Sequence, residues 1–221
     1  MKRKVIKTSD GSSTIFLEDW NESYHSRHGA INEAYHVFIK NGLKKFKNGQ
    51  INILEIGFGT GLNAFITLIE AEELNLKINY EGVEAYPLPE EELKQLNYIE
   101  ELEAEDKGHY FELMHSTKWE EIHKISEVFN LKKRKQFFSD INDINVFNLI
   151  YFDAFGARVQ PELWTEGIFS KMYTALKPGG ILVTYAAKGS VRRAMQSVGY
   201  TVERLPGPPG KREMLRALKE A

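Results

Sequence analysis

The chain has 221 residues, of which 42% are hydrophobic and 27% are charged, and its formal net charge is −2. This length suits one α/β domain with a full core and is short for two. The absence of cysteine excludes disulfides, thiolate metal sites and cysteine nucleophiles, and no apolar run approaches the ~20 residues of a membrane span. We therefore expect a cytoplasmic protein that is not inserted in a membrane.

Charge is distributed unevenly along the chain. Residues 70–127 carry seventeen acids against five Lys or Arg, whereas residues 177–221 carry nine Lys or Arg against three acids. A second basic cluster lies at Lys132-Lys133-Arg134-Lys135. Such polarity is compatible with a nucleic-acid face or with the solvated faces of amphipathic elements. His25, His28 and His36 fit single surface or capping roles better than a zinc site, so we expect no metal.

The first fifty residues read as an N-terminal extension. Residues 1–18 suggest two short strands around the Ser9-Asp10-Gly11-Ser12 turn. A helix is expected over residues 32–40, ending near Asn41-Gly42. We predict a single domain over residues 1–221, with this extension at 1–50 and a Rossmann-like core at 51–221.

The core begins with a strand at 51–56, a glycine-rich turn, and a helix to about residue 73. Glycines at positions 57, 59 and 61 allow a ligand to approach the backbone closely. Leu62 replaces the third glycine of the dinucleotide fingerprint, and no G-K-[ST] follows. Glu55 would repel phosphate and attract a positive group, which favours S-adenosylmethionine with its sulfonium and ammonium charges. An ordinary tight turn between strand and helix is the alternative.

The remaining elements continue a strand–helix alternation. Pro87 and Pro89 interrupt regular structure before an acid-rich helix, and Pro161 begins a helix that Lys177-Pro178-Gly179-Gly180 ends. Strands are expected at 78–85, 127–131, 136–139, 147–152, 181–185, 201–205 and 211–218, and helices at 161–176 and 190–197. The order predicts an α/β fold with a mostly parallel, doubly wound sheet and an antiparallel C-terminal hairpin.

Four predicted strands end at or beside an acid, and ligands of such sheets bind outside the carboxyl ends of the strands. Glu84 can accept both ribose hydroxyls, Asp140 can accept the adenine amino group, and Glu55 can meet the ammonium of the ligand. The first helix's amino end favours the ligand carboxylate. Acids are also common in loops, which is the alternative explanation for each one singly.

Asp153 is the candidate for chemistry. It follows the apolar strand 147–152 and stands between aromatic residues in Tyr151-Phe152-Asp153-Ala154-Phe155. Methyl transfer to an amine needs alignment and an unprotonated lone pair, and a nearby carboxylate can hold the amine and take its proton. A cap on the following turn is the alternative role.

Several short motifs follow one another along nearly the whole chain. They are Tyr24-His25-Ser26, His36-Val37-Phe38-Ile39, residues 55–63, Val83-Glu84-Ala85-Tyr86-Pro87-Leu88, Ser139-Asp140-Ile141-Asn142, Asp153-Ala154-Phe155 with Pro161 and Trp164, Lys177-Pro178-Gly179-Gly180, Val191-Arg192-Arg193 and Gly210-Lys211-Arg212-Glu213-Met214. As an ordered set they resemble the methyltransferase module of MnmC, the bifunctional tRNA wobble-uridine enzyme, and especially its stand-alone (MnmD-like) relatives.

The resemblance implies S-adenosylmethionine-dependent methylation of the exocyclic amine of 5-aminomethyl-2-thiouridine at tRNA position 34. It implies that Asp153 is catalytic. The cofactor would be bound by Glu55, Gly57, Phe58, Gly59, Thr60, Gly61, Asn63, Glu84 and Asp140. The family continues with A-P-x-K-N-P, whereas this chain has Gly156-Ala157-Arg158-Val159-Gln160-Pro161, so Arg158 is expected to replace the missing lysine. No second glycine fingerprint occurs, and we expect a separate enzyme to supply the aminomethyl precursor.

The charge distribution then suggests how tRNA binds around its anticodon. We expect Arg192, Arg193, Lys211 and Arg212, with the 132–135 cluster at a hairpin tip, to contact the phosphate backbone. The target uridine is expected to stack on Phe155, Trp164 or Tyr24, although Trp164 suits core packing equally.

Three other functions stay open. A spermidine-synthase-like aminopropyltransferase has a related fold and an acid near the same strand end, but needs no basic RNA face. The others are a methyltransferase for a small molecule or protein, and a non-catalytic S-adenosylmethionine-binding partner of RNA.

Overall fold

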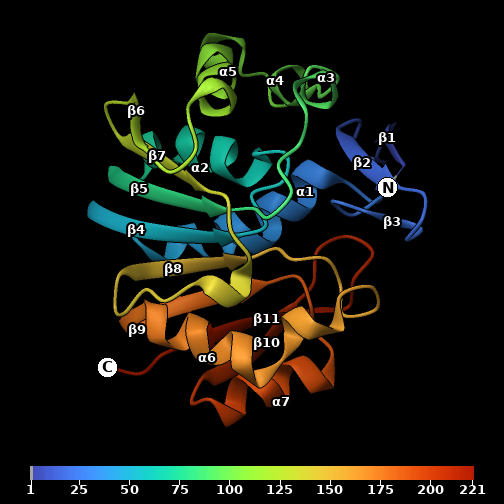
Figure 1. Ribbon diagram of the computed structural model, residues 1–221. Coiled ribbons are helices and arrows are strands. Elements are labelled where there is room, and N and C mark those ends of the chain that lie inside the picture. The colour runs from blue at the N-terminus through green and yellow to red at the C-terminus, as the bar shows by residue number, and fades with distance from the viewer. Residues whose placement is uncertain (1) are drawn as a thin grey trace.

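A computed structural model describes residues 2–221, which form two β-sheets and the helices that cover the larger one (Figure 1). A small sheet has the order β1-β2-β3 and a large sheet the order β10-β11-β9-β8-β4-β5-β7-β6. The strands are β1 Arg3–Lys7, β2 Ser13–Leu17, β3 Glu22–Ser23, β4 Gly49–Ile56, β5 Leu76–Val83, β6 Ile122–Ser126, β7 Phe129–Arg134, β8 Phe147–Phe152, β9 Leu176–Thr184, β10 Thr201–Pro206 and β11 Glu213–Leu218. The helices are α1 Ala30–Ala34, α2 Leu62–Glu73, α3 Glu90–Leu93, α4 Tyr98–Glu101, α5 Gly108–Ser116, α6 Glu166–Ala175 and α7 Gly189–Ser197, with a π-helical turn η1 Tyr35–Lys40 and 3₁₀ turns η2 Leu43–Lys45, η3 Glu105–Lys107, η4 Phe138–Asp140 and η5 Pro161–Trp164.

The centre of the large sheet is parallel. Strand β4 pairs in parallel with β5 on one side and β8 on the other, and β7 and β9 extend the parallel part outward. Strands β6, β11 and β10 are antiparallel to their neighbours. The strand order therefore reverses between β4 and β8, which is where open α/β sheets bind their ligands. The predicted mostly parallel sheet with an antiparallel C-terminal hairpin is confirmed.

Helices cover both faces of the large sheet, which explains why its central strands are apolar throughout. On β4, Ile51 and Ile53 pack in the cluster formed with α1, η1, α2, α4 and α5, whereas Leu54 and Ile56 pack in the cluster formed with α6 and α7 (Figure 1). This alternation directs the side chain of Glu55 to the face covered by α2.

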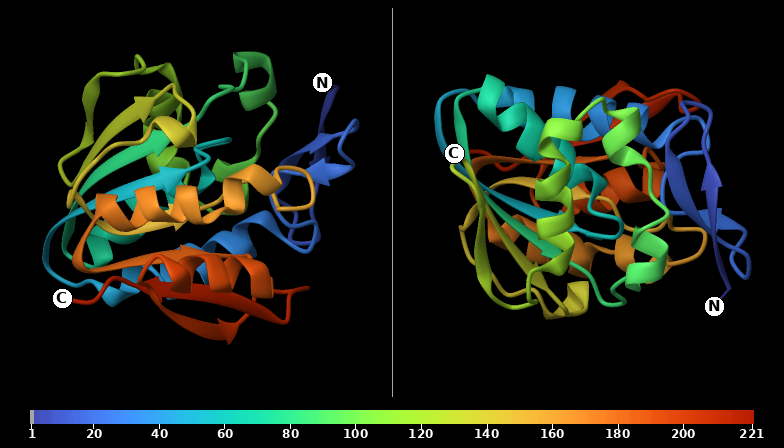
Figure 2. Two further views of the ribbon diagram at one scale, coloured as in Figure 1. Left: turned by 60° about the horizontal axis from the view of Figure 1, so that its bottom comes forward. Right: turned by 90° about the horizontal axis from the view of Figure 1, so that it is seen from above.

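The small sheet lies beside the carboxyl ends of the parallel strands, as three views of the molecule show (Figures 1 and 2). Its first two strands confirm the predicted pair around the Ser9–Ser12 turn. The sequence pattern gave no sign that residues 3–25 fold over the end of the large sheet. The division into an extension and a core within one domain stays a prediction.

The predicted hairpin around the basic cluster is wrong in register. The two strands are β6 and β7, which turn at Glu127-Val128, so the cluster at 132–135 lies in and just beyond β7 rather than at a tip. Residues 136–139 form no strand; 136 and 137 lead into the 3₁₀ turn η4, which begins at Phe138.

Two other boundaries differ from the expectation. The predicted helix 161–176 is the 3₁₀ turn η5 followed by α6, because the extended backbone of Thr165 separates them. Strand β9 begins at Leu176, and its register against β8 shifts across the Lys177–Gly180 segment. Within residues 2–221, no helix is long and apolar enough to cross a membrane.

Candidate active site

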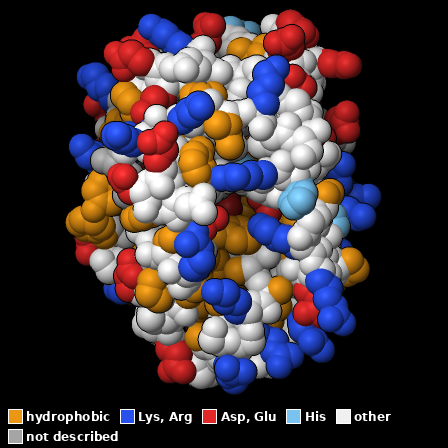
Figure 3. Space-filling model, turned by 90° about the vertical axis from the view of Figure 1, so that its right-hand side faces the viewer, with side chains coloured by type: hydrophobic (Ala, Val, Ile, Leu, Met, Phe, Trp, Pro, Cys, Tyr) orange, Lys and Arg blue, Asp and Glu red, His pale blue; other side chains and the backbone are white. Residues whose placement is uncertain are grey.

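A cavity of about 710 Å³ opens at the carboxyl ends of β4, β5 and β8. Seen from that side, the surface is hollowed near its centre, where hydrophobic and acidic side chains show between Lys and Arg side chains (Figure 3). The lining comes from the small sheet, the glycine turn, the ends of β5 and β8, and η4 and η5. It comprises Arg3, Leu17, Trp20, Tyr24, His25, Gly57, Phe58, Gly59, Thr60, Leu62, Asn63, Glu84, Ala85, Tyr86, Phe137, Phe138, Ser139, Asp153, Ala154, Phe155, Gln160, Glu162, Leu163 and Ile168.

The glycine turn brings the ends of β4 and β8 together. Gly57 has φ +91°, and a Cβ atom there would lie 2.7 Å from the carbonyl oxygen of Asp153. At Gly59, with φ +49°, a Cβ would lie 3.2 Å from the ring of Tyr24. The turn therefore needs glycine both for its left-handed backbone and for the close approach of its neighbours.

Phe58 anchors this turn from inside the protein. Its backbone N–H donates to the Val83 carbonyl over 3.0 Å, and its ring is 3% exposed. The ring packs so closely on Gly82 of β5 that a Cβ on Gly82 would lie 2.3 Å from it. Through these contacts Phe58 holds the glycine turn against β5, a role that the sequence alone did not indicate.

Glu84 lies beside the glycine turn, as predicted for a residue at the end of β5. One carboxylate oxygen accepts the N–H of Gly59 at 3.1 Å and the other accepts the N–H of Tyr86 at 3.0 Å. Burial raises the pKa of Glu84, and the backbone donors partly oppose that rise. Each oxygen retains a lone pair for a further donor in the cavity.

Asn63, in the first turn of α2, joins two acids. Its amide nitrogen donates to Glu55 Oε1 and to Asp153 Oδ2, each over 2.9 Å. Among residues 2–221, the amide oxygen of Asn63 finds no hydrogen-bond partner. A buried amide oxygen without a partner is suited to receive a donor from a ligand.

The expected contact between Glu55 and a ligand does not match its position. Glu55 is 1% exposed, faces α2, and is absent from the cavity lining that the described residues form. Burial raises the pKa of Glu55 well above its usual value, which favours the neutral acid. Glu55 therefore holds Asn63 through a hydrogen bond, while Asn63 rather than Glu55 lines the cavity.

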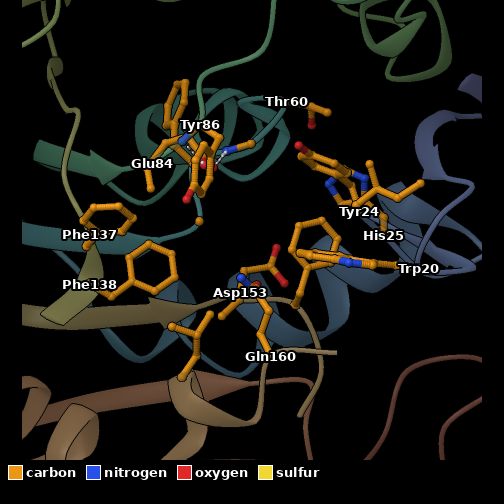
Figure 4. Close-up of a pocket in the computed structure, with 18 of the residues that line it drawn as sticks. Trp20, Tyr24, His25, Thr60, Glu84, Tyr86, Phe137, Phe138, Asp153 and Gln160 are labelled. Atoms are coloured by element: carbon orange, nitrogen blue, oxygen red, sulfur yellow. Dashed lines mark hydrogen bonds between the residues drawn. The ribbon is translucent and has the colours of Figure 1, made fainter. Parts of the chain in front are cut away.

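Asp153 reaches the cavity directly from the end of β8 (Figure 4). Burial raises the pKa of its carboxyl group to about 7, with Glu33 adding to the rise and with Asn63 and Lys211 opposing it. A carboxyl group that titrates near neutrality in a cavity is suited to accept a proton at physiological pH.

Aromatic side chains form the wall next to Asp153. The ring of Phe155 meets Tyr24 edge-to-face at 5.0 Å and Trp20 at 5.4 Å between centroids. Trp20 and Tyr24 lie opposite Phe137 and Phe138 in the cavity, with Glu84 and Asp153 between the two groups (Figure 4). Trp20 was not predicted; its only sequence signal is an aromatic residue in the polar segment Glu18-Asp19-Trp20-Asn21.

Trp164 supports this wall from outside the cavity. It is 6% exposed, packs against Phe152 and Phe169, and donates its indole N–H to the Phe155 carbonyl over 2.7 Å. Trp164 therefore packs in the core, as the alternative interpretation had it, and is not available to stack on a base.

The guanidinium of Arg158 is bonded within the protein. Its guanidinium donates to the carbonyls of Trp20 at 3.0 Å and Asn21 at 3.2 Å and to the Glu22 carboxylate at 2.7 Å. It ties the loop after Asp153 to the turn that carries Trp20. These internal contacts occupy the guanidinium, and a substrate contact of Arg158 in place of the family's missing lysine stays a prediction.

The other end of the cavity is also aromatic. Tyr86 and Phe137 meet edge-to-face at 6.1 Å, and both are largely exposed. Asp140 is exposed at the end of η4 and, among the described residues, does not line the cavity, although Ser139 does. A contact between Asp140 and a bound adenine stays a prediction.

The predicted phosphate contacts divide into exposed and internal side chains. Arg193 and Arg212 are exposed and Arg192 is half-buried. Lys211 pairs with the carboxylate of Glu33. Lys133 is 2% exposed and donates to the His115 carbonyl, and Arg134 is held by Glu81 and Asp143, so these two members of the basic cluster are not available to RNA.

Comparison with known proteins places this geometry in context. A family model described as an S-adenosyl-L-methionine-dependent methyltransferase matches residues 115–220. The bifunctional tRNA 5-methylaminomethyl-2-thiouridine biosynthesis protein MnmC of Leptospira borgpetersenii is 28% identical over 219 residues, covering 91% of this chain and 33% of that protein. MnmC of Aromatoleum aromaticum is 29% identical over 229 residues, covering 96% of this chain and 35% of that protein. The chain thus spans about a third of the length of these relatives.

A solved structure agrees with the sequence matches. MnmC2 from Aquifex aeolicus has a TM-score of 0.77 and 26% identity, covering 100% of this chain and 71% of that one. The resemblance to the MnmC methyltransferase module is confirmed. The predicted Rossmann-like fold is confirmed with it. The match to a family of S-adenosyl-L-methionine-dependent methyltransferases agrees with the predicted activity and cofactor.

A second solved structure shows a shared fold alone. Spermidine synthase from Thermotoga maritima has a TM-score of 0.61 at 12% identity and covers 98% of this chain.

Proposed function

We propose that this chain transfers the methyl group of S-adenosyl-L-methionine to the exocyclic amine of 5-aminomethyl-2-thiouridine at the wobble position of tRNA. The names of the MnmC relatives support this substrate, and the match to one third of their length supports a single module of their activity. The observation that carries the proposal is the position of Asp153, which faces the cavity between the glycine turn and the aromatic wall.

The cavity residues fit the proposed cofactor. Gly57 and Gly59 leave room for a ligand beside the backbone, and Glu84 keeps acceptor capacity for the ribose hydroxyls. The partnerless oxygen of Asn63 suits the ligand ammonium, and the amino end of α2 suits its carboxylate. Phe137 and Phe138 offer apolar surface for the adenine.

Bound S-adenosyl-L-methionine supplies an electrophilic methyl carbon. The protein's own contribution is to hold the acceptor amine in line and to keep it unprotonated. Asp153 Oδ2 is held by Asn63, so the carboxylate has a fixed place from which to bind the amine and accept its proton. Fixed orientation is worth roughly 7–11 kcal/mol of a two-reactant barrier, and a positioned base adds ~10²–10⁴-fold.

The aromatic wall suits the base that carries the amine. Trp20, Tyr24 and Phe155 lie next to Asp153 and can stack on an unpaired uridine of the anticodon loop. Arg193 and Arg212 are exposed and can contact phosphates, which positions tRNA without reading its sequence. We further propose that another enzyme supplies the aminomethyl precursor, that residues 1–221 act as one domain, and that the reaction occurs in the cytoplasm.

The decisive experiment measures transfer of labelled methyl groups to tRNA carrying the aminomethyl group. We expect Asp153→Asn to lower turnover by at least ~10²-fold while binding S-adenosyl-L-methionine normally, because Asn cannot accept the proton. Asp106→Asn, an exposed acid in η3, is the matched control. Turnover of the parent protein should rise between about pH 6 and 8, as Asp153 with a pKa of about 7 loses its proton. Near-normal turnover of Asp153→Asn would remove Asp153 as the base.

The same assay separates the alternatives. The spermidine synthase match supports only a shared fold, and label or aminopropyl transfer to a polyamine, with none to tRNA, would replace the proposal by that activity. Binding of tRNA and cofactor without turnover would indicate a non-catalytic partner.

A further inference from the structure

Two charged residues that lie far apart in the sequence form a shielded ion pair close to Asp153. Glu33 in α1 and Lys211 in the β10–β11 connection are 178 positions apart and contact each other directly. The Glu33 side chain is 8% exposed and that of Lys211 is 31% exposed. The second oxygen of Glu33 accepts the N–H of Ser26 over 2.8 Å, so the carboxylate is fixed on both sides.

A chain of contacts joins this pair to the segment that carries Asp153. The ammonium of Lys211 lies 3.8 Å from the centroid of the Tyr185 ring. The hydroxyl of Tyr185 donates to the Ala154 carbonyl over 2.8 Å, and Ala154 directly follows Asp153. The pair therefore packs on Tyr185, and Tyr185 in turn bonds the backbone next to Asp153.

We infer that the Glu33–Lys211 pair is a positioning element for Asp153. The two opposite charges offset each other near the Asp153 carboxylate, and the pair supports the loop that carries Asp153. The consequence for turnover rests on the proposed function. The contact geometry and its effect on the titration of the Asp153 carboxyl group do not depend on the proposed function. Lys211 thus receives a different role from the phosphate contact that its sequence suggested.

The charged and titratable groups around Asp153 give the sign of each effect. Burial raises the pKa of Asp153 most, the charge of Glu33 raises it further, and the charge of Lys211 lowers it. Asn63 in α2 donates to both Asp153 and Glu55, and the hydroxyl of Tyr185, just beyond β9, donates to the Ala154 carbonyl next to Asp153. His25 has its pKa lowered by burial to about 4 and is neutral in the working range. Glu33 and Lys211 are therefore the pair whose removal changes the charge near Asp153.

Removing either partner should shift the Asp153 titration in opposite directions. Lys211→Met leaves Glu33 uncompensated, so we expect the midpoint to rise by about one pH unit. Glu33→Gln leaves Lys211 uncompensated, so we expect the midpoint to fall by a similar amount. The double variant should return close to the parent value. A phosphate contact would instead change tRNA affinity and its salt dependence, and a purely structural pair would lower activity in both variants without opposite shifts.

The test uses the full chain with ¹³C-labelled aspartate carboxyl groups, and titrates Asp153 by NMR with its signal assigned from Asp153→Asn. Lys211→Arg keeps the charge and should titrate like the parent. Arg204→Met removes an exposed cation of the same hairpin and should also leave the titration unchanged. If Lys211→Met or Glu33→Gln fails to fold, the one that folds is compared with the double variant Lys211→Arg/Glu33→Asp, which keeps both charges. Equal midpoints, or shifts of the same sign, would overturn the inference.

The pH dependence of methyl transfer is then measured in the same variants. If the acidic limb of the pH profile moves in opposite directions in Lys211→Met and Glu33→Gln, the inference extends to catalysis. Opposite NMR shifts in a protein that transfers no methyl group to tRNA would reject the proposed function and keep the inference.

Discussion

Asn63 gives both hydrogens of its amide to carboxyl groups, one to Glu55 and one to Asp153. An aspartate at this position has no hydrogens to give, and a serine has one, so neither can join the two acids. The buried acid at the end of β4 and the asparagine after the glycine turn are thus parts of one support for Asp153. This relation was not visible in the sequence, which indicated both residues as separate ligand contacts.

Gly57 offers a sharp test of how the two strand ends must approach. We expect Gly57→Ala to lower both stability and methyl transfer, because its Cβ would lie 2.7 Å from the Asp153 carbonyl oxygen and push that segment away. Gly49→Ala is the matched control: its φ is +98°, and within the described residues nothing lies within 4 Å of its Cβ. Both variants should lose roughly 1 kcal/mol from backbone strain, measured by urea unfolding. Equal turnover in the two would contradict the close-approach argument.

At the scale of elements, β7 shows why the basic cluster was misplaced. Four consecutive charges are typical of an exposed turn, yet they continue a strand whose alternate residues Phe129, Leu131 and Lys133 are buried. Arg134 is paired with Glu81 on β5 and Asp143 after η4, and Lys133 lies 5.2 Å from the ring of Trp119. These contacts come from other elements, so only the folded chain reveals that Arg134 is paired and that Lys133 is buried.

Arg158 bonds the turn between β2 and β3 that carries Trp20. We expect Arg158→Ala to increase hydrogen exchange in residues 18–24 and to raise the KM for tRNA several-fold, because the guanidinium no longer holds the turn that carries Trp20. Binding of S-adenosyl-L-methionine at the glycine turn should change less. Arg216→Ala, which breaks an ion pair with Glu203 in the β10–β11 hairpin, is the control. Unchanged exchange at 18–24 would show that the sheet docks without this arginine.

Over the whole molecule, the parallel sheet and the ligand edge were predictable, since apolar β-branched runs, glycine turns and strand-end acids mark them. Gly57, Gly59, Glu84 and Asp153 line the cavity as expected. The small sheet's contribution was mostly missed: Tyr24 was predicted, but Arg3, Leu17 and Trp20 were not. Packing of a short N-terminal sheet over a distant edge leaves no periodic signal in the sequence.

Charge at the scale of the molecule predicts how tRNA binding responds to salt. We expect Arg193→Ala/Arg212→Ala to weaken tRNA binding and to reduce the slope of log K against log salt by about 2, one for each phosphate that these arginines would neutralise. Lys132→Ala/Lys135→Ala, two substitutions in the basic cluster, provide the comparison. Filter-binding at several salt concentrations measures both. An unchanged slope in the arginine variant would locate the RNA-binding face elsewhere.

Arg3 lines one side of the cavity, and Lys211 completes the ion pair beside its carboxylate. A nascent chain therefore carries its glycine turn and its base long before the partner of Glu33 has been synthesised. The ion pair therefore joins the first helix of the fold to its last hairpin. Completion of the charges around Asp153 requires nearly the whole length of the chain.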